Sequence, residues 1–377
     1  MRFTCLQENL SRGLALVGRA VATRTTLPIT QNVLIETDQG RLKLSATNLE
    51  LAVTTWVGGE VQEEGSVTIP ARLLTDFVNS LPADRVEMET TGRPLGVRFK
   101  CGRFQANING TAAEEFPPIP TVEEGMTARV EPHVLRTAIG RVAFAAATEE
   151  ARPVLTGVKV EIAGQQFTLA GADGFRLAVF KGSLLEPAPE DTEAIVPART
   201  LLEMQRLLAD QDEPVEIVIT PSRSQLLVHI KNIEVVSQLV QGTFPNYAQL
   251  IPQSANTTAV MNLNEFTRAA RAASIFARDG GGIIRLQMVP GSDGMRGKMV
   301  VTSSAEETGD NTGEIDANVE GAEAKIAFSS RYLTEVLGNL DGESIALETT
   351  TPSSPGVVKP LGGEDYVHVV MPMFVQW

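Results

Sequence analysis

The chain has 377 residues, of which 43% are hydrophobic, and its formal net charge is −14. This length allows two or three domains with separate hydrophobic cores, and the negative charge argues against a generic nucleic-acid-binding protein. Two cysteines, Cys5 and Cys101, do not make a disulfide framework. With no signal peptide at the start and no apolar run of about 20 residues, we expect a soluble cytoplasmic protein that is not inserted in a membrane.

The first helix is expected at residues 9–24, where Leu10, Leu14, Val17 and Val21 form one apolar stripe. Alternating apolar and polar residues, separated by glycine-containing turns, then predict strands. These strands are expected at 32–36, 41–45 and 51–57. A second helix is expected at 70–81.

The same order of elements returns twice along the chain. Helices are expected at 133–144 and 198–209, and again at 264–274 and 330–340. The polar stretch 303–318 is expected to form a loop. Strands of the middle part are expected at 158–162, 167–170, 177–181, 215–220, 225–230 and 234–238.

One segment occurs three times: a short apolar strand that leads through Pro or Ser into a helix beside an arginine. Its copies contain Pro70-Ala71-Arg72, Pro197-Ala198-Arg199 and Ser329-Ser330-Arg331. Proline is tolerated at a helix start, and a serine there can cap the helix. The copies are 127 and 132 residues apart, which is the size of a domain. We therefore predict three similar α+β domains with mainly antiparallel sheets, at residues 1–125, 126–255 and 256–377.

Charge is unevenly distributed between the expected helices and the remaining chain. The six helices carry eleven arginines against four acidic residues, a net charge of +7, which leaves −21 elsewhere. For any single helix, a solvated face is the simpler reading, because arginine is a good helix former. The same bias in all six helices favours a common basic surface that contacts the phosphates of a polyanion. The arginines are Arg12, Arg19, Arg24, Arg72, Arg136, Arg141, Arg199, Arg206, Arg268, Arg271 and Arg331.

Two expected strand edges carry opposite charges. Arg98, Lys100 and Arg103 lie near the end of the first domain, whereas acidic residues gather around a strand of the third. Such edges could join two chains by strand pairing, and two joints of this kind close a ring. On charge alone, two unrelated solvated edges explain the pattern equally well.

Motifs of catalysis and metal binding are missing from the sequence. It has no G-x-x-x-x-G-K-[ST] phosphate loop and no G-x-S-x-G elbow, and its three histidines lie in different segments. Asp173-Gly174 is read as a structural turn. We expect no enzymatic activity, no cofactor and no metal. Pairs of adjacent glutamates are assigned to solvated surface and not to catalysis: Glu63-Glu64, Glu114-Glu115, Glu123-Glu124 and Glu149-Glu150.

Several runs resemble those of a known family. They are Thr26-Leu27-Pro28-Ile29, Ala172-Asp173-Gly174-Phe175-Arg176-Leu177-Ala178, Phe244-Pro245-Asn246-Tyr247 and Val369-Val370-Met371-Pro372-Met373. Together with the triplicated junction, and in this order, they are similar to the bacterial DNA polymerase III beta subunits, the sliding clamps. The resemblance extends over essentially the whole chain.

The resemblance implies the DNA clamp fold, in which each domain has two helices and two antiparallel sheets, and a ring-forming homodimer that encircles duplex DNA. A ring held by topology needs only weak, sequence-independent phosphate contacts, and an acidic exterior keeps DNA off its other surfaces. Arg24 matches a DNA-contacting arginine of the family. From charge placement we add Arg12, Arg19, Arg72, Arg136, Arg141, Arg199, Arg206, Arg268 and Arg271.

The family also binds short peptide motifs of partner proteins in a groove between the second and third domains. The partners implied are the DNA polymerase III alpha subunit, the clamp loader, other polymerases and repair proteins. Leu, Val and Met side chains suit an adaptable pocket for a partner's Leu or Phe. The matching positions are Leu155, Ala172, Gly174, Phe175, Arg176, Leu177, Pro245, Gln249, Leu250, Val369, Met371, Pro372 and Met373.

The family's dimer contact pairs a Phe on the edge of the first domain with apolar residues that end the first helix of the third. The matching residues here are Phe104, Ile275 and Phe276. Ionic pairs would add about 0–1 kcal/mol each, so strand pairing and aromatic packing should dominate. The ionic residues are Arg98, Lys100 and Arg103 on one side and Glu306, Glu307 and Asp310 on the other.

The sequence departs from the family at Phe175, where histidine is common, at Ala172, where threonine is common, and in a longer tail from Phe374 to Trp377. The first two changes make the pocket more apolar and are expected to alter which peptides bind. Two alternatives to a replication clamp stay open: a divergent clamp paralogue that serves DNA repair and, less favoured, an enzyme that acts on a polyanion.

Overall fold

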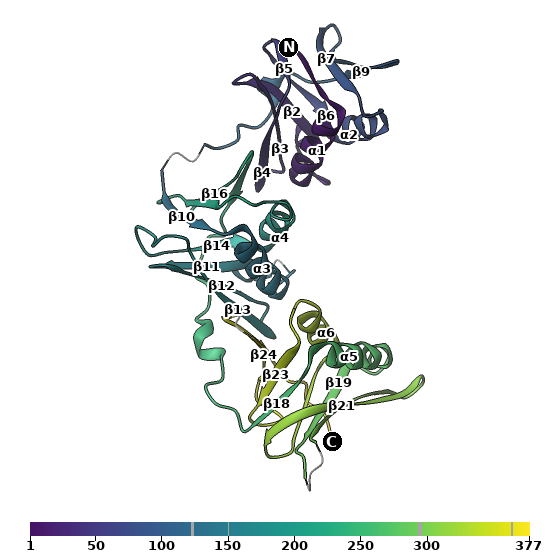
Figure 1. Cartoon of the computed structure of the whole chain (residues 1–377), viewed down its shortest axis with the longest axis vertical. Helices are drawn as coiled ribbons and strands as arrows, with labels where there is room; N and C mark the ends of the chain where they lie inside the picture. The colour runs from purple at the N-terminus through teal and green to yellow at the C-terminus, as the bar shows by residue number, and fades with distance from the viewer. Residues whose placement is uncertain (122–123, 150, 293–295, 363–364) are drawn as a thin grey trace. The chain divides into compact units, whose positions relative to one another are not determined.

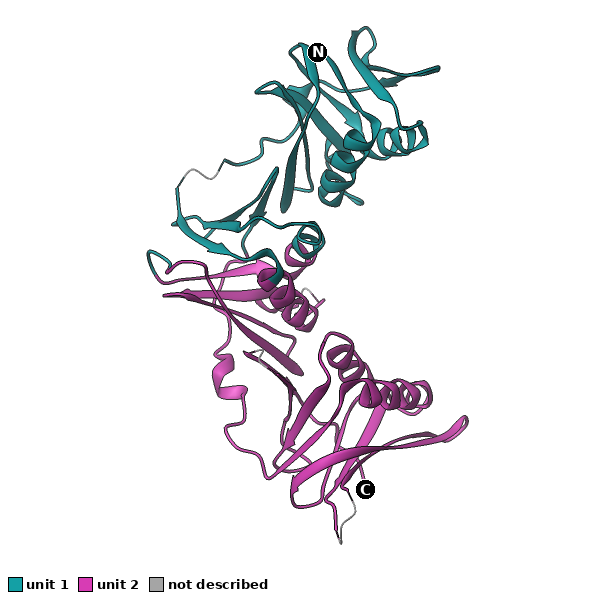
Figure 2. Cartoon of the chain, viewed as in Figure 1, with its two compact units in different colours: residues 1–133, 188–190, 203–239 teal, residues 134–187, 191–202, 240–377 magenta. Residues whose placement is uncertain are grey.

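The computed structural model describes residues 1–121, 124–149, 151–292, 296–362 and 365–377. The chain forms two compact units, which divide the middle predicted domain between them (Figure 2). Unit 1 comprises residues 1–133, 188–190 and 203–239. Unit 2 comprises residues 134–187, 191–202 and 240–377.

Unit 1 contains two antiparallel sheets (Figure 1). The five-stranded sheet has the order β5-β1-β7-β8-β9, and the eight-stranded sheet has the order β10-β15-β16-β17-β4-β3-β2-β6. Pairing of β17 with β4, in which Val236 lies opposite Ala52, joins strands of the middle domain to the first. The strands are β1 (Arg2–Leu6), β2 (Asn32–Asp38), β3 (Arg41–Thr47), β4 (Leu51–Val57), β5 (Glu60–Glu63), β6 (Ser66–Pro70), β7 (Arg85–Gly92), β8 (Leu95–Cys101), β9 (Phe104–Asn109), β10 (Met126–Val130), β15 (Val215–Ile219), β16 (Gln225–Ile230) and β17 (Ile233–Gln238).

Two helices of unit 1, α1 (Gln7–Val17) and α2 (Ala71–Ser80), pack against each other, and α1 also packs on β3 and β4. Three residues of the predicted stripe form the buried face of α1: Leu10, Leu14 and Val17 are at most 1% exposed. The fourth, Val21, lies beyond the end of the helix and is partly buried. Burial of each of the three helical side chains contributes about 1.5–3 kcal/mol, so this stripe fixes the helix on the sheet. Unit 1 also contains three short 3₁₀ segments: η1 (Gly18–Ala20), η2 (Pro28–Gln31) and η3 (Ala113–Glu115).

Unit 2 contains one antiparallel set of twelve strands, in the order β14-β11-β12-β13-β25-β24-β23-β18-β21-β20-β19-β22. The pairing of β13 with β25 joins the middle domain to the third and places Leu177 opposite Val369. The strands are β11 (Gly157–Ala163), β12 (Gln166–Ala172), β13 (Arg176–Ser183), β14 (Thr192–Pro197), β18 (Thr257–Asn262), β19 (Ile283–Val289), β20 (Lys298–Ala305), β21 (Gly309–Gly321), β22 (Ala324–Ser329), β23 (Ser344–Thr349), β24 (Gly356–Leu361) and β25 (Asp365–Val370).

The remaining helices are α3 (Pro132–Val142), α4 (Ala198–Leu207), α5 (Leu263–Ala277) and α6 (Ser330–Gly338), with the 3₁₀ segments η4 (Ala143–Ala145), η5 (Pro153–Thr156) and η6 (Tyr247–Leu250). In unit 2, α5 and α6 lie side by side as α1 and α2 do in unit 1 (Figure 1). The side chain of Asn262 caps α5 by accepting a hydrogen bond from the Glu265 N–H at 3.1 Å. No helix in the described ranges is both long and apolar enough to span a membrane.

The triplicated junction is confirmed as a strand that runs directly into a helix. The strands β6, β14 and β22 end at Pro70, Pro197 and Ser329, and α2, α4 and α6 begin at the next residue. The capping role predicted for the serine is wrong, because the Ser329 side chain makes no cap hydrogen bond. The six predicted helices and the antiparallel α+β class are confirmed.

The structure also corrects the predicted secondary structure at two places. The first helix ends at Val17 and η1 at Ala20, so Arg24 lies in the following bend and not on a helix. The stretch 303–318, expected to be a loop, belongs to the hairpin of β20 and β21, whose register runs from Ala305 opposite Gly309 to Lys298 opposite Asp316. From Thr312 to Asn318, polar residues alternate with small or apolar ones, and such alternation is compatible with a strand exposed on one face.

Candidate functional sites

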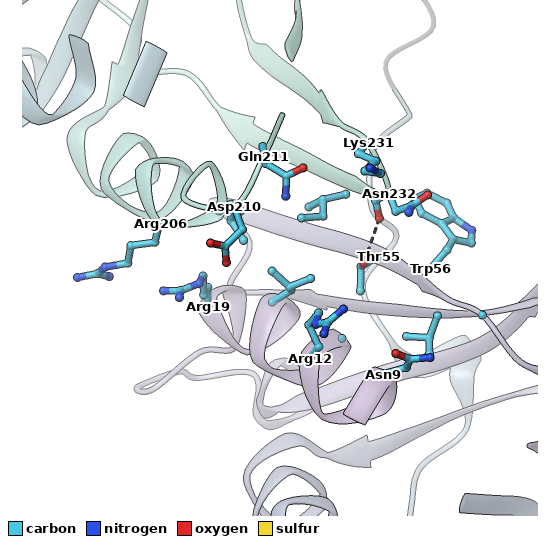
Figure 3. A pocket seen from close by; sticks show the side chains of 16 residues that line it. Asn9, Arg12, Arg19, Thr55, Trp56, Arg206, Asp210, Gln211, Lys231 and Asn232 are labelled. Carbon is cyan, nitrogen blue, oxygen red and sulfur yellow. Dashed lines mark hydrogen bonds between the residues drawn. The ribbon is translucent and has the colours of Figure 1, made fainter. Parts of the chain in front are cut away.

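Most of the predicted arginines are exposed. They include Arg12 on α1, Arg19 in η1 and Arg206 at the end of α4, which line one cavity of unit 1 with a volume of about 750 Å³ (Figure 3). The other exposed members are Arg24, Arg72, Arg136, Arg199, Arg268 and Arg271. The structure thus brings three of the predicted arginines together within unit 1.

Neighbouring carboxylates moderate the charge of this cavity. Glu203 accepts hydrogen bonds from Arg19, at 3.2 Å, and from Arg206. Lys231, which also lines the cavity, is paired with Glu213 at 2.8 Å, and this contact raises the pKa of the lysine. Asp210 also lines the cavity, and Asp212 lies 3.7 Å from Lys231, so carboxylates offset most of the positive charge of the arginines. The cavity can therefore hold an anion only weakly.

Arg141 does not belong to an exposed surface. Its side chain is 5% exposed and donates hydrogen bonds to the Asn339 carbonyl and to Asp341, the latter at 3.2 Å. Both acceptors follow α6, so Arg141 ties α3 to the end of that helix. A buried arginine that already has these acceptors cannot reach a phosphate, and we remove it from the predicted DNA-contacting set.

The predicted groove residues fall into a buried floor and an exposed rim, all within unit 2. The floor consists of Leu155, Ala172, Leu177 and Val369, which belong to one apolar cluster and are at most 8% exposed. The rim carries large apolar side chains that solvent reaches: Phe175 is 61% exposed, Leu250 54%, Met371 44% and Met373 37%. Pro245 and Gln249 lie exposed on the connector that precedes the third domain. Exposed apolar side chains above an apolar floor are typical of a site for another protein.

The loop between β12 and β13 gives the rim its shape. The Asp173 carboxylate accepts hydrogen bonds from the N–H groups of Phe175, at 2.9 Å, and Arg176, at 3.0 Å. Gly174 has a φ of +94°, a conformation that favours glycine. The Phe175 carbonyl in turn accepts a hydrogen bond from the Met371 N–H at 2.8 Å, which joins the two sides of the rim.

Arg176 was predicted to line the groove, but its side chain is only 2% exposed. It lies between the rings of Phe144 and Tyr332 and donates hydrogen bonds to Asp173, Glu335 and the Phe144 carbonyl. A guanidinium held in this way supports the loop from beneath. We correct its assignment from a contact residue to a supporting one.

The connector segment is fixed to β11 by a polar contact. The Tyr247 hydroxyl donates a hydrogen bond to Glu161, and Lys159 lies 2.8 Å from the same carboxylate. Burial alone would raise the pKa of Glu161, but the hydrogen bonds from Lys159 and Tyr247 hold this pKa below its usual value. Tyr247 also packs on the apolar cluster, so the connector that carries Leu250 is anchored on the floor of the groove.

The predicted edge residues lie at exposed strand borders. β9 is the last strand of its sheet and begins with Phe104, which is 55% exposed. In unit 2, β21 pairs with β20 over 309–316 and with β18 only over 317–321. Ile275 near the end of α5 is 63% exposed, and Phe276 is partly buried. Both borders are therefore available for further strand pairing.

Some of the ionic residues at these borders already form ion pairs within their own sheet. Arg98 lies 3.6 Å from Glu89, and Lys100 lies 3.8 Å from Glu87, both within the same sheet. Arg103 is exposed in the turn before β9. Glu306, Glu307 and Asp310 are exposed at the tip of the β20–β21 hairpin.

Groups that could support catalysis or metal binding are scarce in the described residues. No cluster of three or more His, Cys, Asp or Glu side chains suitable for a metal ion occurs among them. Of the adjacent glutamates, Glu123 and Glu150 lie outside the described residues. The remaining ones are exposed: Glu63, Glu64, Glu114, Glu115, Glu124 and Glu149.

Comparison with known families decides between the clamp and the enzyme as interpretations of this fold. Three family models, for the N-terminal, central and C-terminal domains of the DNA polymerase III beta subunit, match residues 1–120, 129–246 and 248–374. The chain belongs to the DNA polymerase III beta subunit family. It therefore has the three-domain α+β fold of the sliding clamps, and its function is that of a non-catalytic processivity clamp in DNA replication.

Individual relatives agree with this family assignment. Beta sliding clamps of Bacillus subtilis and Synechococcus elongatus are 29% and 30% identical, with 99% of each chain covered. Solved sliding-clamp structures from Bacillus subtilis and Pseudomonas aeruginosa superpose with TM-scores of 0.91 and 0.90, at 28% identity and full coverage of both chains. The likeness thus extends over the whole beta subunit.

Two residues beside the groove of this beta subunit family member were missed by sequence reasoning. Tyr332 stacks on Phe175, with ring centroids 6.3 Å apart, and Tyr332 and Arg152 both line a cavity of about 430 Å³ beside the loop between β12 and β13. Tyr332 stands next to Arg331 in the third copy of the junction, but nothing in that copy indicates a contact with a loop more than 150 residues away.

Proposed function

We propose that two copies of this chain form a ring around duplex DNA and that the exposed helix arginines face the DNA. The observation that carries the proposal is the separation of charge: arginines gather on the helices, three of them around one cavity, although the chain has a net charge of −14. Phosphate contacts of this kind carry no sequence information. They suit a protein that must move along any sequence.

The proposed DNA contacts are weak because acidic side chains lie next to the arginines. Arg19 and Arg206 already share Glu203, and Arg72 lies 4.0 Å from Asp76. Exposed arginines with acidic neighbours exchange partners easily, since such ion pairs are worth only about 0–1 kcal/mol. Retention would then depend on ring closure, while the arginines reduce the repulsion between DNA and an acidic protein.

Topological binding predicts a difference between circular and linear DNA. After loading by a clamp loader, the protein should stay on nicked circular duplex DNA through gel filtration and leave when a restriction enzyme linearises it. The measurement is the fraction of labelled protein that co-elutes with DNA, at about 0.15 M salt so that the Debye length is about 8 Å. A control digest at a site absent from the circle should leave retention unchanged, and equal retention on both forms would contradict the ring.

We further propose that the homodimer forms between β9 of one copy and β21 of the other. Support comes from the border of β9 and from the length of β21 over residues 309–316 that pairs only with β20 among the described strands. Phe104 would pack on Ile275 and Phe276. Arg103, with Glu306, Glu307 and Asp310 opposite, would supply the ionic contacts, because Arg98 and Lys100 already have neighbours in their own sheet.

The groove of unit 2 is proposed to bind short peptide motifs of the polymerase alpha subunit, the clamp loader and other polymerases and repair proteins in the cytoplasm. Its floor and rim offer contiguous apolar contact for a partner's Leu or Phe, and Met side chains adapt to different shapes. Phe175 and Ala172 make this groove more apolar than a histidine and a threonine would.

A substitution on the rim should weaken peptide binding. Leu250→Asp is expected to lower affinity for a Leu-Phe-containing peptide by about tenfold or more, because it places a charge on an apolar contact. Leu250 is 54% exposed, so the fold should tolerate the change. The matched control is Leu49→Asp, a 53% exposed leucine in a turn of unit 1. Fluorescence polarisation measures both; equal affinities of the two variants would remove Leu250 from the site.

A further inference from the structure

The triplicated junction carries an acidic residue four positions after its arginine. These residues are Asp76, Glu203 and Glu335, which follow Arg72, Arg199 and Arg331. Residues four apart on a helix are neighbours, so the simplest expectation is an exposed ion pair between the arginine and the acid within each helix. The three copies differ in what the acid contacts, and only one of them reaches the peptide groove.

In the first copy, the acid makes a contact of the expected kind. Asp76 lies 4.0 Å from Arg72, and both side chains are more than 70% exposed. In the second copy, Glu203 bridges Arg19 and Arg206 and is 24% exposed. Neither contact involves the groove of unit 2.

In the third copy, Glu335 bridges an exposed and a buried arginine. One carboxylate oxygen lies 3.0 Å from Arg331, whose side chain is 63% exposed. The other accepts a hydrogen bond from Arg176, whose side chain is 2% exposed. Glu335 therefore connects the surface of α6 to the guanidinium beneath the groove loop.

The charge of Arg176 depends on a small set of carboxylates. Its charge is compensated by two carboxylates, Asp173 and Glu335, and its remaining hydrogen bond goes to the Phe144 carbonyl. The first carboxylate also holds the loop, since Asp173 accepts hydrogen bonds from the N–H groups of Phe175 and Arg176. If the second were lost, Asp173 alone would balance a buried guanidinium, and removal of one partner from such a group is costly.

We propose that Glu335 is a positioning residue of the peptide groove, which acts through Arg176 and Asp173 to fix the loop that carries Phe175. This inference rests on the proposed role of the groove. Glu335 itself needs no contact with the peptide. Its contribution is to hold the rim in the binding conformation before the peptide arrives, so that binding does not have to order the loop.

The test compares Glu335→Gln with Glu203→Gln, a change at the same position of the preceding repeat. Both glutamates bridge two arginines, so the variants remove the same charge from the same kind of contact. Fluorescence polarisation with a labelled Leu-Phe-containing peptide measures affinity. We expect about a tenfold loss for Glu335→Gln, because the buried guanidinium of Arg176 then keeps only one of its two charged partners, and no loss for Glu203→Gln.

Hydrogen exchange separates positioning from a general loss of stability. In Glu335→Gln, the amides of Phe175 and Arg176 should exchange faster, whereas those in the middle of β11 and β12 should keep the rates of the native sequence. Unchanged exchange in the loop, or affinity equal to that of Glu203→Gln, would overturn the proposal. If the unsubstituted protein fails to bind the peptide, the proposed groove function is wrong, and the exchange rates still decide whether Glu335 holds the loop.

Discussion

Arg136 and Arg141 lie on the same helix, α3, but have different environments. Arg136 is exposed, whereas Arg141 is buried and hydrogen-bonded to the segment that follows α6. Sequence gives both the same charge and the same helical context. The difference arises because α6 ends beside Arg141. A hydrogen bond to a charged group stabilises the fold by about 1.5–3 kcal/mol, which favours the buried position of this arginine.

His368 is a second residue whose state is set by its surroundings. Its ring is fully buried, stacks on Phe144 with centroids 5.6 Å apart, and lies 3.0 Å from the Tyr366 hydroxyl through Nδ1. Nε2 has no hydrogen-bond partner among the described residues. Burial, with a further contribution from the Arg176 charge, lowers the pKa of His368 from 6.5 to about 3. The folded protein therefore keeps this histidine neutral.

This lowered pKa predicts a loss of stability in acid. Between pH 6.5 and about 3 the unfolded chain binds a proton at His368 and the folded chain does not, so the contribution present above pH 6.5 is lost as the pH falls. His368→Gln should reduce the slope of unfolding free energy against pH by up to about 1.4 kcal/mol per unit. Urea unfolding from pH 7 to pH 4 measures it, with the exposed His133→Gln as control; parallel curves for all three proteins would contradict the assignment.

At the scale of elements, the borders of β9 and β21 are where sequence and structure differ most. The hairpin of β20 and β21 occupies a stretch that polar composition assigned to a loop. Because a strand exposed on one face alternates polar residues with small or apolar ones, composition alone does not separate the two. The hairpin extends β21 beyond its pairing with β18, and this creates the border that the proposed dimer needs.

Strand pairing at this border predicts that Phe104→Asp yields monomers. Phe104 is 55% exposed, and a buried aromatic in an interface commonly contributes about 2 kcal/mol or more. The dissociation constant of the dimer should therefore rise at least about 30-fold. Sedimentation equilibrium measures it, and Phe374→Asp, at a phenylalanine that is 86% exposed in the tail, should stay dimeric. A dimer that survives Phe104→Asp would place the interface elsewhere.

At the scale of the whole molecule, the two compact units do not coincide with the three repeats. The middle repeat contributes β10, β15, β16 and β17 to unit 1 and β11 to β14 to unit 2. Sheet pairing explains this, since β17 pairs with β4 of the first repeat and β13 with β25 of the third. The boundaries at residues 125 and 255 stay a prediction, and the family models match the three repeats at 1–120, 129–246 and 248–374.

The sequence by itself determined the six helices, most of the strands, the triplicated junction and the family. These depend on local information: the apolar stripe of α1, the alternation in β3, and short runs such as Ala172 to Ala178. The groove residues Leu155, Ala172, Leu177 and Val369 are also apolar in sequence, and the structure places them in one cluster.

Only the tertiary structure decided what chemically similar residues do. Asp76, Glu203 and Glu335 occupy one position of the repeat, yet their partners differ. Asp76 pairs with one exposed arginine, Glu203 with two exposed arginines, and Glu335 with one exposed and one buried arginine. Likewise, Arg141 and Arg176 are buried while other predicted arginines are exposed. The physical reason is that burial and pairing of a charge depend on segments distant in sequence, which local periodicity does not encode.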